Sequence, residues 1–355
     1  MSVKLNRQPL LPGWLSALLS VAFVLSAIAV LIFAYLTVQH LMTAPDSDET
    51  AAEGIDGGLT SVDGGLAPVT IIEGATAEPA VQPTIGAWEG NDRVNILLVG
   101  IDRRPGEAFV SRTDSMMVIS VDPEADSMSI LSIPRDLYVQ IPGYGQDRIN
   151  TALVYGAREG DYLDGAALAM QTVSSNLGIP INHFVMVDFG AFVRIVDLLE
   201  GIDVQVPYDI NDSLYPDMDY GYDPLFIPAG MQHFDGQMAL KYARTRHADS
   251  DFNRAYRQQQ VLFAARSKAL SLGIGQMILR APSLYREVEG GIRTDLNLEQ
   301  LVRLAKTVSD IPSDNTQNRV LDQDYVTSFR TPGGASVLLL NSDVAMPMIQ
   351  ELFGN

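Results

Sequence analysis

The run VNILLVGID (94–102) is apolar along most of its length and passes into a polar end, which is the pattern of a buried β-strand. Two more apolar runs, SMMVISVD (115–122) and MSILSIP (128–134), flank the turn-forming residues 123–126 and predict a β-hairpin. HFVMVDF (183–189) has the composition of a further strand. We therefore expect a sheet built around the first of these runs.

Helical patterns are spaced between the strand candidates. They cover residues 165–177, 191–201 and 252–273, and Gly201 is placed to end the second helix. Residues 202–207 alternate between apolar and polar side chains like another strand. Because strands occur both in hairpins and joined by helices, the sequence predicts an α/β fold with a mixed sheet and helices on both faces.

The overall composition excludes several classes of function. The chain has 355 residues and a net charge of -19, whereas a nucleic-acid binder needs excess positive charge, so we expect no nucleic-acid partner. Because it has no cysteine, disulfides, thiolate nucleophiles and cysteine-ligated metals are excluded. Neither the GxGxxG fingerprint nor the GxxxxGK[ST] loop occurs, so the sequence does not favour dinucleotide binding or P-loop chemistry.

An apolar run without charged residues, WLSALLSVAFVLSAIAVLIFAYLTV, occupies residues 14–38. Its 25 residues rise about 37 Å as a helix, enough to cross a hydrocarbon core of about 30 Å. Trp14 and Tyr35 near its ends suit the membrane interface. A cleavable signal peptide is the alternative, but the apolar part of a signal peptide is only about 7–15 residues long. We therefore expect an uncleaved signal-anchor helix.

The flanking charges predict the orientation of this helix. Lys4 and Arg7 precede it, and the next basic residue is Arg93, so the positive-inside rule places the N-terminus in the cytoplasm. The segment after the helix is rich in Gly, Ala, Pro and acidic residues and cannot bury enough apolar surface to order itself. The predicted organisation in the cell membrane is a cytoplasmic tail (1–13), a transmembrane helix (14–38), a flexible acidic linker (39–92) and an extracytoplasmic domain (93–355).

A first group of charged residues gathers where the predicted strands begin and end. It comprises Asp102, Arg103, Arg104, Arg112, Asp114, Arg135 and Asp136. Charged residues at several strand ends converge on one edge of a sheet, which is where α/β folds place their ligands. A set of structural Arg–Asp pairs is the alternative interpretation.

A second group lies in KYARTRHADSDFNRAYRQQQ (241–260). Arg244 and Arg246 are two residues apart and share a face if the segment is extended. Arg254 and Gln258 are four residues apart and share a helix face, with Arg257 adjacent. Closely spaced arginines repel one another unless an anion or carboxylates neutralise them. A phosphate-rich ligand would do so, and the alternative is a solvated charged helix face.

The two groups together suggest a divalent cation and a diphosphate. Mg²⁺ binds through one or two carboxylates together with substrate phosphates, and arginine recognises phosphate through its planar, forked donors. The chain has only 4 histidines and no cysteine, which argues against a zinc site.

At these motifs the chain resembles the LytR–CpsA–Psr family. The resemblance covers about residues 95–260 and is carried by NILLVGID, RTDSMMVISVDP, LSIPRDLYVQIPG, RINTALVYG, VDFGAFVRIVDLLEGIDV and FDGQMALKYARTRH with DFNRAYRQQQ. It implies an α/β/α sandwich around a central mixed sheet. It also implies a Mg²⁺-dependent phosphotransferase of cell wall biogenesis, which moves a glycopolymer from a polyprenyl-pyrophosphate carrier to peptidoglycan.

The resemblance also assigns residues by motif position. Asp102 and Asp114 match the family's Mg²⁺-linked aspartates, and together with Arg135 they are the candidate catalytic residues. The residues that match its pyrophosphate-binding positions are Arg135, Arg244, Arg246, Arg254 and Gln258, with Arg112 and Arg257 as further contacts. The family's usual Gly-Gly-Val is Glu200-Gly201-Ile202 here, Asn253 stands where Gly is common, and Arg148 stands where Lys is frequent.

Two other functions fit the same residues. The first is hydrolysis of the polyprenyl-pyrophosphate with water as the acceptor, which needs the same phosphate-binding groups. The second is a non-catalytic, membrane-anchored lipid-binding sensor or scaffold, and Asp102 and Asp114 argue against it because a sensor needs no metal-binding carboxylates.

Overall fold

The computed structural model describes residues 92–103, 107–158, 161–217, 221–246, 249–273 and 288–354. The predicted cytoplasmic tail and membrane helix lie outside these residues, as does the linker up to residue 91. Within the described ranges, no helix is both long and apolar enough to cross a membrane.

A central mixed sheet organises the domain. In the described part of the chain its six strands follow the order β11 (Ile292–Thr294), β6 (His183–Asp188), β1 (Val94–Ile101), β2 (Thr113–Asp122), β3 (Ser127–Ser132) and β12 (Thr316–Val320). β1 pairs antiparallel with β2 and parallel with β6, and β3 pairs antiparallel with β2 and parallel with β12. The predicted mixed sheet and its β2–β3 hairpin are therefore confirmed.

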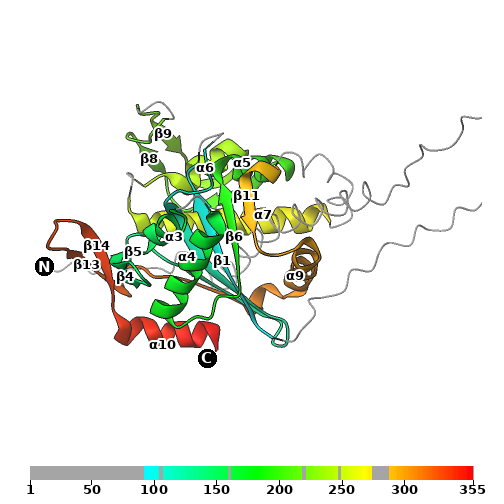
Figure 1. The fold of residues 1–355 in the computed structure, drawn as a ribbon. Coiled ribbons are helices and arrows are strands. Elements are labelled where there is room, and N and C mark those ends of the chain that lie inside the picture. The colour runs from blue at the N-terminus through cyan, green and yellow to red at the C-terminus, as the bar shows by residue number, and fades with distance from the viewer. Residues whose placement is uncertain are drawn as a thin grey trace, which may run out of the picture.

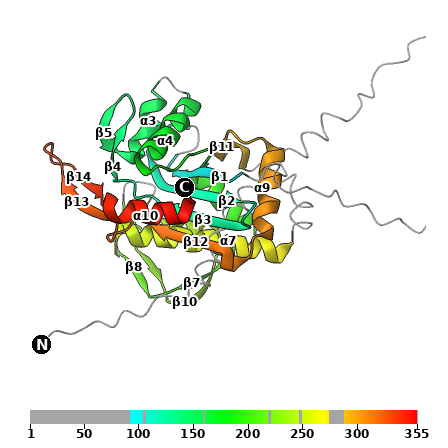
Figure 2. The same ribbon diagram turned by 90° about the horizontal axis from the view of Figure 1, so that it is seen from below.

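Helices cover both faces of the sheet, as the apolar character of β1 requires (Figures 1 and 2). Ile96 and Leu98 face one core, and Leu97 and Val99 face the other. The first core is covered by α5 (Phe189–Leu198), α6 (Gly236–Arg244), α7 (Asp251–Leu272) and α9 (Leu298–Asp310). The second is covered by α3 (Ala152–Gly156), α4 (Tyr162–Leu177) and α10 (Ser342–Phe353).

Smaller elements surround these layers. Among the described residues, two-stranded sheets are formed by β4 (Tyr138–Ile141) with β5 (Gly145–Arg148), β7 (Ile202–Val206) with β10 (Gly230–Phe234), β8 (Ile210–Asp212) with β9 (Leu225–Ile227), and β13 (Val326–Arg330) with β14 (Ser336–Leu340). Short 3-10 turns are η1 (Ile149–Thr151), η2 (Glu289–Gly291) and η3 (Ser313–Asn315). The predicted strand 202–207 thus forms, but it pairs outside the central sheet.

The ends of α5 differ from the prediction of a helix over 191–201. The helix begins at Phe189 because the Asp188 side chain accepts a hydrogen bond from the Ala191 backbone N–H at 2.7 Å. It ends at Leu198, since Glu200 and Gly201 adopt the left-handed region with φ of 61° and 81°. The Gly201 N–H reaches back to the Val196 carbonyl at 3.0 Å and closes the helix end.

The strand register gathers the charged strand ends at one edge of the sheet. Ile101 lies opposite Thr113 after a bulge at Gly100, so Asp102, which directly follows β1, lies near the start of β2 at Asp114. Gly100 approaches the neighbouring strand closely, because a Cβ there would lie 2.5 Å from the Ser115 hydroxyl. Arg135 follows β3, which runs antiparallel to β2 and ends at the same edge.

Candidate functional site

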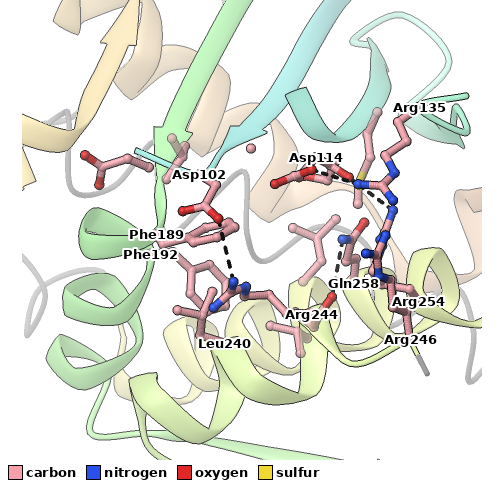
Figure 3. Close-up of a pocket in the computed structure, with 18 of the residues that line it drawn as sticks. Asp102, Asp114, Arg135, Phe189, Phe192, Leu240, Arg244, Arg246, Arg254 and Gln258 are labelled. Atoms are coloured by element: carbon pink, nitrogen blue, oxygen red, sulfur yellow. Dashed lines mark hydrogen bonds and ion pairs between the residues drawn. The ribbon is translucent and has the colours of Figure 1, made fainter. Parts of the chain in front are cut away.

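A cavity of about 420 Å³ lies between the sheet and helices α5, α6 and α7 (Figure 3). Its inner wall is apolar and is formed mainly by Leu98, Met117, Phe189, Phe192, Leu240 and Leu262. Its rim is polar and carries Asp102, Asp114, Arg135, Arg244, Arg246, Arg254 and Gln258. The cavity therefore joins an apolar inner part, here called the slot, to a charged mouth.

Arg135 is held at the mouth by carboxylates from two other segments. Its Nη1 donates to Asp114 Oδ1 at 3.0 Å, and its Nε lies 3.3 Å from Asp251 Oδ2. Burial alone would lower the pKa of Arg135, but Asp251, Asp114 and Asp136 raise it above its ordinary value. Arg135 is thus a fixed cation, anchored to both the sheet and α7.

Arg254 is the more deeply buried cation of the rim, with a side chain only 10% exposed. It contacts Asp251 at 3.2 Å and the Asp114 carbonyl at 3.4 Å. Burial lowers the pKa of Arg254 below its ordinary value, and Asp251 offsets this only in part because the nearby Arg135 lowers it too. An anion bound at the mouth would relieve this shortage of negative charge.

Arg244 occupies the other side of the mouth (Figure 3). Its Nη2 lies 3.6 Å from Asp102 Oδ2, and its guanidinium stands 4.6 Å from the centre of the Phe189 ring. Arg246 is exposed on the rim and lies on the opposite side from the Arg244 guanidinium, close to Arg254 (Figure 3). Gln258 donates to the Ala243 carbonyl at 3.3 Å, on the α7 face that it shares with Arg254, as their spacing predicted.

Arg244 and Arg246 both line the cavity, and they do so at the end of a helix. Arg244 is the last residue of α6, and the chain leaves the helix at Thr245. Thr245 turns inward, where its hydroxyl donates to the buried Asp212 carboxylate at 2.6 Å. At the end of α6, Arg244 and Arg246 therefore point to the cavity, whereas Thr245 between them points into the protein.

Arg257 and Arg112 are the predicted pyrophosphate ligands that the structure does not bring to this cavity. The Arg257 side chain is 4% exposed and forms an ion pair with Asp249, with nitrogen–oxygen distances of 2.5 and 3.1 Å. It also donates to the Tyr242 carbonyl at 3.2 Å and to the Thr245 carbonyl. Arg257 therefore clamps the end of α6 instead of facing a ligand, and Arg112 is exposed before β2.

The sequence indicated Asp249 and Asp251 as carboxylates that could partly neutralise the arginines, and Asp251 does bridge Arg135 and Arg254. Sequence reasoning missed the apolar residues of the site. Phe189 and Phe192 line the slot, but their spacing fits any buried helix face and indicates no ligand. Arg103, expected at the rim, instead donates to Asp188 at 2.6 and 3.1 Å, while Arg104 lies outside the described residues.

Asp102 and Asp114 are suited to a hard cation. Their side chains are 43% and 33% exposed, and both line the cavity. Within the described ranges, no cluster of three or more His, Cys, Asp or Glu side chains could hold a metal alone. Mg²⁺ takes one or two carboxylates and completes its shell with substrate phosphates and water, so these two side chains are of the type that this ion binds.

The sequence profile of the LytR_cpsA_psr family matches residues 69–343, which is most of the chain. The chain belongs to the LytR–CpsA–Psr family. Its similar proteins include TagU of Oceanobacillus iheyensis, named a polyisoprenyl-teichoic acid–peptidoglycan teichoic acid transferase, at 34% identity over 219 residues. That match covers 61% of this chain and 63% of the relative, so it spans less than two thirds of the relative's length. TagU of Enterococcus faecalis is 32% identical, over 66% of this chain and 73% of its own.

Solved structures of the LytR–CpsA–Psr type share the fold. A structure described as TagT bound to LIIa-WTA has 28% identity and a TM-score of 0.58, and the match covers 74% of this chain and 92% of that chain. The crystal structure of B. subtilis TagT has 28% identity and a TM-score of 0.56, over 75% and 93% of the two chains. The mixed α/β architecture is therefore that of the family.

Proposed function

We propose that this LytR–CpsA–Psr protein transfers a glycopolymer from a polyprenyl-diphosphate carrier to a hydroxyl group of peptidoglycan. The observation that carries the proposal is the two-part cavity, in which an apolar slot opens directly into a rim of arginines. The names of the TagU relatives support the same reaction class.

The two parts of the cavity match the two parts of such a donor. The prenyl chain enters the slot between Phe192, Leu240 and Leu262, where burial of its methylene groups contributes about 0.8 kcal/mol each. The diphosphate lies against Arg135, Arg244 and Arg254, whose forked donors recognise phosphate oxygens. The apolar slot alone would not bind the diphosphate, and the arginine rim alone would not bind the prenyl chain.

Asp102 and Asp114 would hold Mg²⁺ at the mouth, together with phosphate oxygens of the donor. The ion would neutralise phosphate charge during transfer. Both carboxylates already face arginines, Asp102 at 3.6 Å from Arg244 and Asp114 at 3.0 Å from Arg135. The metal and the arginines would therefore converge on one diphosphate.

The reaction is a phosphoryl transfer. The acceptor hydroxyl oxygen forms a bond to the phosphorus next to the sugar, the bridging P–O bond breaks, and the hydroxyl proton passes to a base. Polyprenyl phosphate leaves with the bonding electrons. Arg135 and Arg254, fixed by Asp251, stabilise the charge that develops on the leaving phosphate.

The reaction would take place outside the cytoplasm at the cell membrane. The apolar run 14–38 would anchor the chain as a single-pass helix with its N-terminus inside. The acidic linker would let the mouth of the cavity reach both a membrane lipid and the cell wall.

The test is an assay of the purified full-length protein with a lipid-linked donor and Mg²⁺, with and without soluble peptidoglycan oligomers. Transfer predicts a product that carries both polymer and peptidoglycan, and polyprenyl phosphate release that depends on the oligomers and stops with a chelator. Equal phosphate release without oligomers would identify a hydrolase. Donor binding without turnover would identify a lipid sensor and contradict the proposal.

A further inference from the structure

A stacked pair of tyrosines lies at the β4–β5 hairpin, which follows Arg135 in the chain. Tyr144 is at the tip of the β4–β5 hairpin and Tyr155 is in α3, with ring centres 5.0 Å apart and planes 5° from parallel. Tyr144 is 44% exposed. The ring face that it turns away from Tyr155 is therefore open to a ligand.

Two flanking glycines hold Tyr144 in a tight turn, and the space beside these glycines is open. Gly143 and Gly145 flank it with φ of 80° and 85°, which fixes a tight turn, and a Cβ added to either would meet no atom within 4 Å. Beneath it, the Tyr155 hydroxyl donates to Asp147 Oδ2 at 2.5 Å. The exposed ring therefore rests on an anchored partner.

A cation stands beside both rings. The guanidinium of Arg158 lies 4.9 Å from the centre of the Tyr155 ring and 5.3 Å from that of Tyr144. Arg158 is exposed, so its donors remain accessible to hydroxyl or carboxylate groups of a ligand. An aromatic face edged by an arginine, a carboxylate and glycines suits a polar ring better than an extended apolar partner.

Ion pairs connect this platform to the arginine rim. Arg148, which follows Asp147 in β5, contacts Asp136 at 3.0 Å, and Asp136 lies 3.9 Å from the Arg135 guanidinium. Tyr144 is four residues from Arg148, about 13 Å along the strand. A glycan chain that runs along β5 from Tyr144 would therefore come to Arg148, whose ion pair with Asp136 links it to Arg135 at the mouth.

We propose that Tyr144 is the stacking platform for a sugar ring of the peptidoglycan acceptor, with Arg158 facing the carboxylates of its stem peptide. The proposal rests on the transfer function proposed above and names the place where the acceptor binds. Sugar rings present C–H groups to the face of an aromatic ring, and a rigid tyrosine loses little conformational freedom on binding. The platform would hold the glycan strand while a hydroxyl further along it enters the mouth.

The test measures binding of a soluble disaccharide-tetrapeptide from peptidoglycan to the full-length protein in nanodiscs, by isothermal titration calorimetry. Tyr144→Ala should weaken the affinity about tenfold, and Tyr144→Phe should stay within about twofold because it keeps the ring. Tyr222→Ala is the matched control, since Tyr222 is 66% exposed on a different hairpin. It should bind like the wild type.

A kinetic measurement separates this proposal from the proposed function. In the transfer assay, Tyr144→Ala should raise the KM for the peptidoglycan oligomer about tenfold and leave the KM for the lipid donor unchanged. Fragment binding that depends on Tyr144 would support the platform even if no transfer occurred, and absent transfer would count against the proposed function alone. Wild-type affinity in Tyr144→Ala, or no fragment binding by the wild type, would overturn the platform.

Discussion

Replacing Arg257 by methionine should destabilise the fold, because this arginine holds the end of α6 in place. The substitution keeps the length and apolar stem of the side chain but removes its charge. It leaves Asp249, whose side chain is 12% exposed, without its cationic partner, so that only the Tyr208 hydroxyl still donates to the carboxylate from another side chain, and it removes the Arg257 hydrogen bonds to the Tyr242 and Thr245 carbonyls. Breaking a buried ion pair from one side costs about 3 to 5 kcal/mol.

Thermal unfolding of the full-length protein in detergent, followed by far-UV circular dichroism, measures this loss. For a domain of this size each kcal/mol lowers Tm by about 2 to 4 °C, so a decrease of about 6 to 20 °C is expected. Adding Asp249→Asn should cost less than the sum of the two single changes, since both remove the same pair. An unchanged Tm together with weakened donor binding would contradict the structural role of Arg257 and show that it contacts the ligand instead.

The pH dependence gives an independent check on the same pair. Burial alone would raise the pKa of Asp249, but hydrogen bonds and charge from Arg257 hold it below its ordinary value. The ionised carboxylate therefore stabilises the wild type above about pH 3.9, and this contribution is lost as the pH falls through the lower folded-state pKa. In Arg257→Met burial raises the pKa of Asp249, so its ionised carboxylate destabilises the fold, and the difference in stability from the wild type should shrink as the pH falls toward and below about 3.9.

Further substitutions test the rim, the slot and the core. Arg135→Lys keeps the charge but not the forked donors, so kcat for transfer should fall about 10²-fold with an unchanged Tm; wild-type turnover would contradict the role of Arg135. Leu240→Asn puts a polar group into the slot and should raise KM about tenfold for a long-chain donor but little for a short-chain one; an equal effect on both would contradict the slot. Arg266 is 2% exposed, and burial lowers its pKa to about 10, so its charge is unfavourable in the fold at every pH below that value. Arg266→Met should therefore raise stability by about 1 to 3 kcal/mol in urea unfolding, and a lower midpoint would contradict this.

Local sequence patterns predicted the elements whose causes are local. The β2–β3 hairpin follows from two apolar runs around a short turn, and Arg254 and Gln258 share a face because a helix repeats every 3.6 residues. The meeting of Asp102, Asp114 and Arg135 also followed from their places at strand ends. The hairpin and the shared helix face need only neighbouring residues, and the meeting at the strand ends also needs the three strands to pair in order.

Features that depend on contacts between distant parts of the chain could not be predicted from local sequence patterns. β12 pairs with β3 across a long stretch of chain, and β7 pairs with β10 instead of joining the central sheet. The inward orientation of Arg257 depends on carbonyl groups of α6 that no pattern in α7 indicates. Whether an arginine binds a ligand or a helix end is decided by tertiary packing, so composition alone could not separate the two roles.

The most direct test of the central claim is a crystal structure of the protein with a short prenyl diphosphate. We expect a diphosphate within hydrogen-bonding distance of Arg135 and Arg254, and a prenyl chain between Phe192 and Leu240. A diphosphate bound away from these arginines, or a chain lying outside the slot, would contradict it.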